Sequence, residues 1–165
     1  MNELEDLYRE IILDHYRSPR NCGELAVPPA HRVEGFNPLC GDEIVIFLDV
    51  RDGVLEDLKI SGRGCSISQS SASMMSAAVK GLPVDEVRRL VRSFKSMMAI
   101  EVPPAARAGA PDESTVEAVD PATLGELGAL QGVVKFPVRI KCATLAWNAL
   151  AQGLDEIAVG ELGGA

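Results

Sequence analysis

Two cysteines of the chain stand where the local sequence favours a reactive or metal-binding thiol. Cys40 is followed by Gly41 and Asp42, and the glycine lets the backbone turn so that the thiol and the carboxylate project toward one point. Cys65 directly precedes a segment with helical character. A thiol at a helix N-terminus lies near the positive end of the helix dipole and near unpaired N–H groups, which favour the thiolate. Both positions therefore predict a sulfur atom available for chemistry.

A third cysteine, Cys142, lies near Arg139 and Lys141, and neighbouring cations also favour a thiolate. Three thiolates and the Asp42 carboxylate are a suitable ligand set for tetrahedral zinc, with Zn–S bonds of about 2.3 Å. Thiolates equally suit iron–sulfur clusters. The long spacing between the cysteines is not a zinc-finger pattern. The residues by themselves therefore leave buried or incidental thiols as the alternative to a metal site.

The composition indicates one globular domain spanning residues 1–165. Apolar residues make up 47% of the 165 residues, and the net charge is −8. An acidic chain is a poor non-specific ligand for nucleic acid or an anionic membrane. Its opening residues, Met1 to Asp6, lack the basic start and apolar stretch of a secretory signal. No segment approaches the roughly 18 apolar residues that span a bilayer. We therefore expect a cytoplasmic protein, in a compartment where disulfides are rare.

The elements that must position these residues follow from hydrophobic periodicity. The pattern predicts a first helix, three strands of which the last two form an antiparallel hairpin, two further helices and a last helix. We expect the turn of the hairpin at Arg51-Asp52-Gly53. The expected elements are 3–17, 31–36, 43–50, 54–61, 66–80, 84–96 and a final helix from Pro137 to about Gln152.

Two segments differ in character from these elements. Residues from about 99 to 132 contain several prolines and many Ala and Gly residues. They predict a surface insertion before the last helix, with a short helix near 121–130. The tail, about 154–165, ends in Gly-Gly-Ala and is expected to be frayed.

Four blocks of sequence occur in an order that is typical of one known family. They are Asn37-Pro38-Leu39-Cys40-Gly41-Asp42, Gly62-Arg63-Gly64-Cys65-Ser66-Ile67-Ser68, Ser71-Ala72-Ser73-Met74-Met75 and Phe136-Pro137-Val138-Arg139-Ile140-Lys141-Cys142-Ala143-Thr144-Leu145-Ala146-Trp147. On these blocks the chain resembles the SufU branch of the IscU/NifU N-terminal family, from about residue 4 to residue 152. IscU-type members carry a His immediately before the third Cys, where this chain has Lys141. That departure and the insertion both favour the SufU branch.

The resemblance implies an α+β fold, SufE/NifU-like, with a three-stranded antiparallel sheet packed with helices. It implies zinc ligation by Cys40, Asp42, Cys65 and Cys142, and no other cofactor. SufU-like proteins take persulfide sulfur from a SufS-like, PLP-dependent cysteine desulfurase, and Cys40 matches the acceptor. The implied protein is a sulfurtransferase-type acceptor rather than a stand-alone enzyme. We expect Arg139 and Lys141 to steady anionic sulfur or a partner carboxylate, and downstream iron–sulfur assembly proteins to be further partners.

Two other functions remain open at this point. The same ligands could hold a transient [2Fe–2S] cluster or iron, which would make the chain a scaffold that passes clusters to apo-proteins. Alternatively, zinc could be structural in a non-catalytic interaction module. Cys22 lies outside every motif and is expected to be an incidental loop thiol. His15 is expected to pack or to form a hydrogen bond, and the serines near Ser73 are expected to cap and pack rather than to act as nucleophiles.

Overall fold

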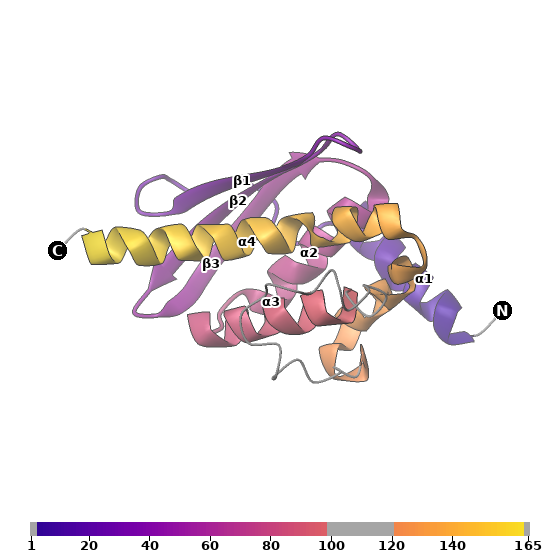
Figure 1. The fold of residues 1–165 in the computed structure, drawn as a ribbon. Coiled ribbons are helices and arrows are strands. Elements are labelled where there is room, and N and C mark those ends of the chain that lie inside the picture. The colour runs from indigo at the N-terminus through magenta and orange to yellow at the C-terminus, as the bar shows by residue number, and fades with distance from the viewer. Residues whose placement is uncertain (1–2, 99–120, 164–165) are drawn as a thin grey trace, which may run out of the picture.

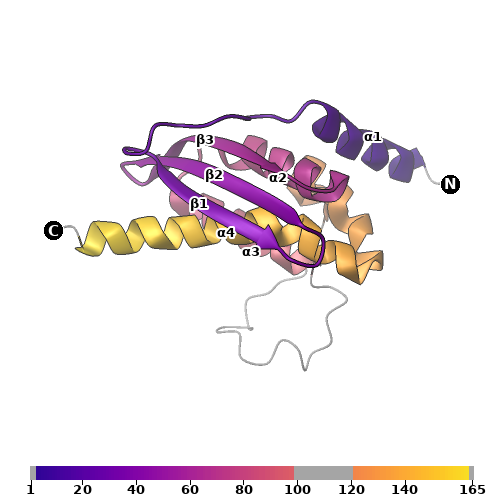
Figure 2. The same ribbon diagram turned by 90° about the horizontal axis from the view of Figure 1, so that it is seen from above.

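The computed structural model describes residues 3–98 and 121–163, and its centre is a three-stranded antiparallel sheet with strand order β1-β2-β3 (Figure 1). Helices α2 and α4 pack against the sheet, α2 on β3 and α4 on β1 and β2 (Figure 2). The predicted α+β class is confirmed. The elements are α1 Glu3–Arg17, β1 His31–Asn37, β2 Asp42–Arg51, β3 Val54–Arg63, α2 Ser66–Val79, α3 Val84–Met98, η3 Pro121–Lys135 and α4 Pro137–Gly163.

The central strand β2 explains why the sheet forms where the sequence predicts it. Ile44, Ile46 and Leu48 alternate along β2 and are buried, which is the pattern of a strand with a core-facing side. The turn to β3 has positive φ angles at both Asp52 and Gly53, as a type I′ hairpin turn requires. The predicted hairpin is therefore confirmed, and its register aligns the start of β2 with the end of β3.

The core between the helices is organised around Trp147 of α4. Its ring stacks on Phe94 of α3 with the ring centroids 4.2 Å apart. Its indole N–H donates to Ser71 Oγ at 3.1 Å, and that hydroxyl donates to the carbonyl oxygen of Ala143 at 2.6 Å. A buried Trp N–H without a partner would be costly. The small serines of α2 therefore serve close packing and hydrogen bonding, which fixes the position of α4.

The predicted surface insertion is only partly right. Residues 99–120 lie outside the described residues. The following segment forms η3, two short helical pieces joined at Gly125, where φ is 60°. The predicted short helix near 121–130 is thus present, but Leu127 and Leu130 are buried in the core. This part of the segment is core rather than surface, because η3 packs against α1, α3 and α4.

The expected frayed tail, about 154–165, is helical over residues 154–163, because α4 continues as far as Gly163 and runs along the length of the molecule (Figure 1). Residues 164–165 lie outside the described residues. Leu154 is buried in the core. Gly153, which directly follows the expected end of the last helix at about Gln152, permits close packing: a Cβ there would lie 2.7 Å from Leu48 Cδ1. Tertiary contacts thus outweigh the low helix propensity of glycine. No helix in the described part of the chain is long and apolar enough to cross a membrane.

A glycine at the end of β3 generates the first prediction. Gly62 has φ +131°, and a Cβ there would lie 2.2 Å from the backbone oxygen of Glu43. Gly53 also has positive φ, but a Cβ there would meet nothing within 4 Å. We expect Gly62→Ala to lower the free energy of unfolding by about 1–3 kcal/mol more than Gly53→Ala, because only Gly62→Ala adds a steric clash to the backbone strain. Urea denaturation of both variants measures this difference, and equal losses would contradict it.

Candidate metal centre

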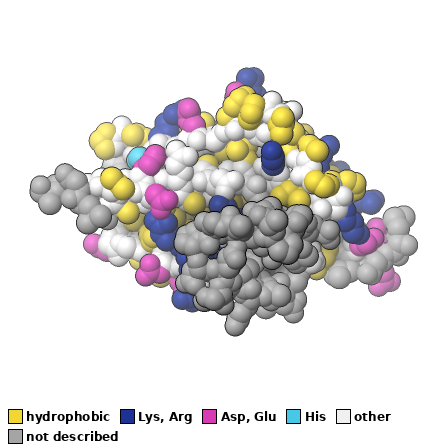
Figure 3. All heavy atoms as spheres, viewed as in Figure 1, with side chains coloured by type: hydrophobic (Ala, Val, Ile, Leu, Met, Phe, Trp, Pro, Cys, Tyr) yellow, Lys and Arg dark blue, Asp and Glu magenta, His cyan; other side chains and the backbone are white. Residues whose placement is uncertain are grey.

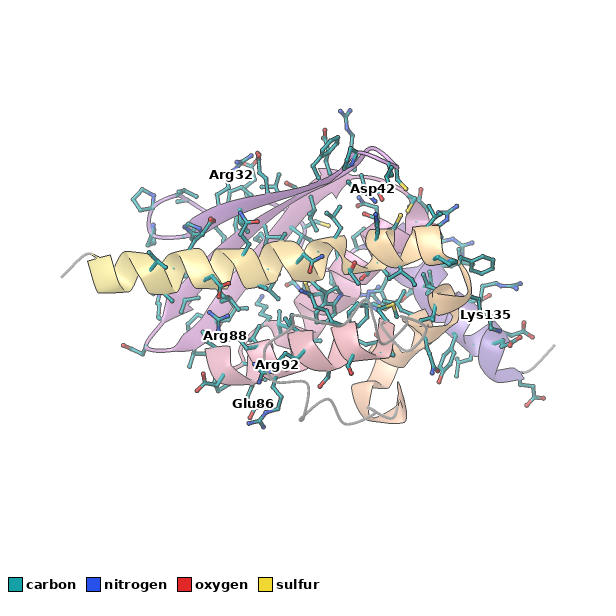
Figure 4. The ribbon with its side chains drawn as sticks, viewed as in Figure 1. Arg32, Asp42, Glu86, Arg88, Arg92 and Lys135 are labelled. Carbon is teal, nitrogen blue, oxygen red and sulfur yellow. The ribbon has the colours of Figure 1, made fainter. Side chains whose placement is uncertain are left out.

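The candidate metal centre lies at one end of the sheet, where the β1–β2 turn meets the first turns of α4. Cys40, Asp42 and Cys142 each offer a ligand atom there, and these atoms all lie within 4.8 Å of one another. The Cys142 thiol donates to Cys40 Sγ at 3.5 Å. Figure 4 shows Asp42 at this end of the molecule, beside the start of α4. The fold therefore brings together two thiols and a carboxylate from segments far apart in the sequence.

The turn between β1 and β2 positions Cys40. The backbone oxygen of Asn37 accepts from the N–H groups of Cys40 at 3.3 Å and of Gly41 at 2.8 Å. The Asn37 side-chain oxygen accepts from the N–H of Leu39 at 3.2 Å. Gly41, with φ +70°, returns the chain to β2, which is the conformation that glycine adopts at least cost. Cys40 is thereby held on a compact turn and remains exposed.

Asp42 and Cys65 join β2 to the N-terminus of α2. Asp42 is fully buried, and its Oδ1 accepts from the backbone N–H of Cys65 at 2.9 Å. The Cys65 thiol lies 3.8 Å from Asp42 Oδ2 and caps α2 by accepting from the N–H of Ser68 at 3.5 Å. Cys65 is therefore adjacent to the group of three but is not within 4.8 Å of all its ligand atoms. The expected fourth ligand caps a helix in this structure.

The pKa of the Cys142 thiol is shifted in the opposite direction to the one that its neighbours in sequence suggest. Burial, followed by its hydrogen bonds to the Asp42 and Cys40 side chains, raises the pKa of the Cys142 thiol far above its usual range. Arg139 and Lys141 are exposed, whereas Cys142 is buried on α4. Desolvation of the sulfur therefore opposes the thiolate that these two cations are expected to favour.

The residues of this centre fit a zinc ion. Their donor set of thiols and one carboxylate is the kind that zinc binds in proteins. Among residues 3–98 and 121–163, no Lys, Arg or His forms an ion pair with Asp42, although its side chain is buried. A buried carboxylate without a cation is costly, and a bound metal would remove that cost.

Cys22 and His31 have side chains of a kind that can bind a metal, but both lie outside this group. Cys22 is exposed and sits on a loop that bridges to Ile60 of β3. Its thiol points to the backbone oxygen of Pro19 at 3.7 Å. His31 is paired with Glu156 of α4 at 3.2 Å. Neither Cys22 nor His31 belongs to the described group of possible metal ligands.

A hydrogen-bonded relay elsewhere was not foreseen from the sequence. Buried His15 contacts Ser73 Oγ through Nδ1 at 2.8 Å and Glu126 through Nε2 at 2.9 Å. The order of serine, histidine and carboxylate resembles a nucleophile triad. Ser73 is fully buried, however, and its oxygen accepts from the N–H of Arg20. The relay therefore ties α1 to α2 and η3, and His15 is a hydrogen-bonding residue as predicted. The contact could not be predicted from the sequence, because His15 and Ser73 are 58 residues apart along the chain.

Comparisons with known proteins show which family the chain is similar to. Residues 7–143 match the family described as the NifU-like N terminal domain. The chain is 42% identical over 151 residues to the zinc-dependent sulfurtransferase SufU of Bacillus subtilis, covering 92% of this chain and 91% of that protein. It is 35% identical over 158 residues to the iron–sulfur cluster assembly scaffold protein IscU of Streptococcus pyogenes, covering 96% of this chain and 89% of that protein.

A solved structure supports the same assignment of the fold. It is the crystal structure of a candidate iron–sulfur cluster assembly scaffold protein of the SUF system from Fervidobacterium islandicum. It superposes with a TM-score of 0.72 at 27% sequence identity. The match covers 88% of this chain and 94% of that one. The likeness therefore extends over most of the fold.

Gly64 generates a prediction about the ligand geometry. A Cβ at Gly64 would lie 2.5 Å from Asp42 Oδ1, whereas one at Gly132 would meet nothing within 4 Å, and neither position has a positive φ. We expect Gly64→Ala to displace the carboxylate and to weaken zinc binding by about 10- to 100-fold, the usual effect of disturbing groups that orient a ligand. Gly132→Ala should bind zinc as the wild type does. Competition with a chromophoric chelator measures both, and equal affinities would refute the predicted role of Gly64.

The raised pKa of Cys142 predicts how the stability of the metal-free protein depends on pH. The folded apoprotein keeps the Cys142 proton at pH values where the unfolded chain loses it. Its free energy of unfolding should therefore fall, by up to about 1.4 kcal/mol per pH unit, as the pH rises above the ordinary thiol pKa of about 8.5. Urea denaturation between pH 7.5 and 10 measures this slope. Cys142→Ala should remove this part of the slope, and an unchanged slope in that variant would contradict the assignment.

Proposed function

The chain belongs to the family of NifU-like N-terminal domains, whose members work in iron–sulfur cluster assembly, and we propose that it is a zinc-dependent sulfur acceptor. In this proposal it takes persulfide sulfur from a PLP-dependent cysteine desulfurase through Cys40, with Cys40, Asp42, Cys65 and Cys142 as zinc ligands. The reaction belongs in the reducing cytoplasm, where thiols persist. The similarity to the zinc-dependent sulfurtransferase SufU of Bacillus subtilis supports this choice within the family.

The single observation that carries the proposal is the exposure of Cys40 beside a buried partner thiol. Cys40 is exposed on a turn, while Cys142, 3.5 Å away, is buried on a helix that is packed into the core. Cys65 caps a helix. A sulfur acceptor must meet a persulfide that another protein presents, and Cys40 alone of these thiols combines exposure with a place on a loop. Cys142 and Cys65 suit the role of fixed ligands.

The proposed transfer is a thiol–persulfide exchange. The Cys40 thiolate attacks the outer sulfur of the desulfurase persulfide, so that a new S–S bond forms at Cys40. The S–S bond of the desulfurase breaks, and its cysteine leaves with the electron pair as a thiolate, so no external oxidant or reductant is required. A bound zinc ion would keep the ligand thiols deprotonated at neutral pH. In this proposal Arg139 and Lys141, which are both exposed, would stabilise anionic sulfur or a carboxylate of the partner.

Substitution of the cysteines tests the assignment of roles. We expect Cys40→Ala to abolish stimulation of the desulfurase and to carry no persulfide. Cys65→Ala and Cys142→Ala should lose most of the zinc, because each removes a proposed ligand. Cys22→Ala is the matched control, since its thiol lies outside the metal group, and should keep full zinc content and stimulation. Metal analysis and mass-spectrometric mapping of the persulfide provide the readouts. A persulfide on Cys65 or Cys142, or full zinc in both of their variants, would refute the roles.

The similarity to IscU of Streptococcus pyogenes makes a cluster scaffold the second candidate function. Matched apo, zinc and iron forms, assayed anaerobically with one desulfurase, separate the two. We expect a colourless protein with about one zinc per chain, as one four-ligand site requires, and loss of stimulation when the zinc is removed. Stimulation by apoprotein equal to that by the zinc form would contradict the zinc requirement. An iron form that builds a cluster and passes it to an apo-acceptor would favour the scaffold.

A further inference from the structure

Asn37, at the end of β1, has a buried side chain with one unused hydrogen-bonding group. The residue is 6% exposed. Its side-chain oxygen accepts from the N–H of Leu39 at 3.2 Å, which fixes which end of the amide is the nitrogen. That nitrogen, Nδ2, is buried and has no hydrogen-bond partner among residues 3–98 and 121–163. A buried donor without an acceptor costs free energy, so its place in the fold calls for a physical reason.

The Asn37 side chain lies on the same face of the sheet as the side chain of Asp42. The two residues are paired across β1 and β2. Paired residues of antiparallel strands project their side chains to the same side, with Cβ atoms about 4.5–5.5 Å apart. Asp42 forms the group of possible metal ligands with Cys40 and Cys142. The unused donor is therefore held on the side of the sheet that carries the candidate ligands.

The packing of α4 on β1 shows which part of the helix faces each strand residue. A Cβ at Gly153 would lie 3.0 Å from Val33 Cγ1, and a Cβ at Gly35 would lie 3.2 Å from Ala149 Cβ. The helix therefore runs antiparallel to the strand. Two residues along the strand, at about 3.3 Å each, match four to five residues along the helix, at about 1.5 Å each.

One more such step brings Asn37 to the part of α4 that holds Cys142. It leads from Gly35 to Asn37 on the strand and to about residues 141–145 on the helix. Cys142 is 1% exposed, and hydrophobic side chains gather over the end of the sheet and the start of α4 (Figure 3). Water therefore has little access to this sulfur, whereas exposed Cys40 can receive hydrogen bonds from water. A thiolate buried in this way needs N–H donors from the protein.

We propose that Asn37 is a positioning residue of the metal centre, and that its Nδ2–H donates to the Cys142 sulfur when that sulfur is an anionic ligand. The inference rests on the proposed function, in which Cys142 binds zinc. In the metal-free protein the Cys142 thiol keeps its proton and donates to Cys40 Sγ, and a thiol sulfur is only a weak acceptor. On metal binding the proton is released to solvent, and the charged sulfur accepts from Asn37 instead.

Replacing the amide with a hydroxyl tests the inference. The hydroxyl of Asn37→Ser can still accept from the N–H of Leu39, but it is too short to replace the amide N–H. We expect Asn37→Ser to raise the Kd for zinc at least tenfold, the usual effect of losing a group that orients a ligand. Asn148→Ser is the matched control, because Asn148 is exposed on α4, and it should bind zinc as the wild type does. Competition with a chromophoric chelator measures both values.

The Co²⁺-substituted protein gives a readout that a purely structural role would not change. An N–H donor lowers the energy of the thiolate lone pairs. The thiolate-to-Co²⁺ charge-transfer band of Asn37→Ser should therefore lie at longer wavelength than that of the wild type. The shift should persist in a Cys40→Ala background, because Cys142 is the acceptor. An unchanged band together with a raised zinc Kd would overturn the assignment to a sulfur. Loss of the shift in the Cys40→Ala background would overturn the assignment to Cys142.

Nuclear magnetic resonance of the wild type tests the inference whether or not Asn37→Ser folds. On titration with zinc, one Nδ2 proton of Asn37 should move downfield, because it becomes a donor to an anion, while the side-chain amide protons of Asn148 stay in place. An Asn37 signal that does not respond to zinc, or a folded Asn37→Ser variant with the wild-type Kd, would overturn the inference and leave the proposed function standing. A wild type that binds no zinc would refute the proposed function and the inference together.

Discussion

The placement of the Asp42 carboxylate is the constraint on which the site depends. It is fully buried at the first residue of β2, accepts the backbone N–H of Cys65 and lies within reach of the thiols of Cys40 and Cys142. One side chain thus joins the sheet, the N-terminus of α2 and the start of α4. Its burial requires the close approach of Gly64, where a Cβ would meet the carboxylate. A carboxylate so enclosed is stable only with compensation, which a helix N-terminus provides in part and a metal would complete.

Different structural elements hold the thiols of Cys142 and Cys40. Cys142 is anchored by α4, whose position is fixed by the hydrogen bonds from Trp147 to Ser71 and from Ser71 to the backbone of Ala143. Cys40 is held only by the short turn that begins at Asn37. A fixed thiol beside an exposed one suits a site that must retain a metal while one sulfur reacts. The packing of the core around Trp147 and the chemistry at the surface are therefore directly connected.

The surface around the candidate metal centre is built from the same segments that carry the candidate ligands. The turn that presents Cys40 also presents Leu39, and the helix that holds Cys142 also carries Val138, Arg139 and Lys141 at its start. Apolar contact and positive charge are thereby assembled by the segments that supply the ligands. A change in how α4 starts would therefore alter the thiol geometry and the surrounding surface together.

The sequence by itself determined the local elements and the identity of the candidate ligands. Some signals act over only a few residues, so they can be recognised in one sequence. They are the alternation in β2, the turn at Asp52-Gly53 and the glycine before Asp42. Tertiary structure alone decided the rest. It buried Leu130 in a segment that looked like a surface insertion, extended α4 past Gly153, joined His15 to Ser73, and raised the pKa of the Cys142 thiol by burial despite its basic neighbours. Each of these depends on contacts between distant residues, because burial and desolvation are set by what packs against a side chain and not by its neighbours along the chain.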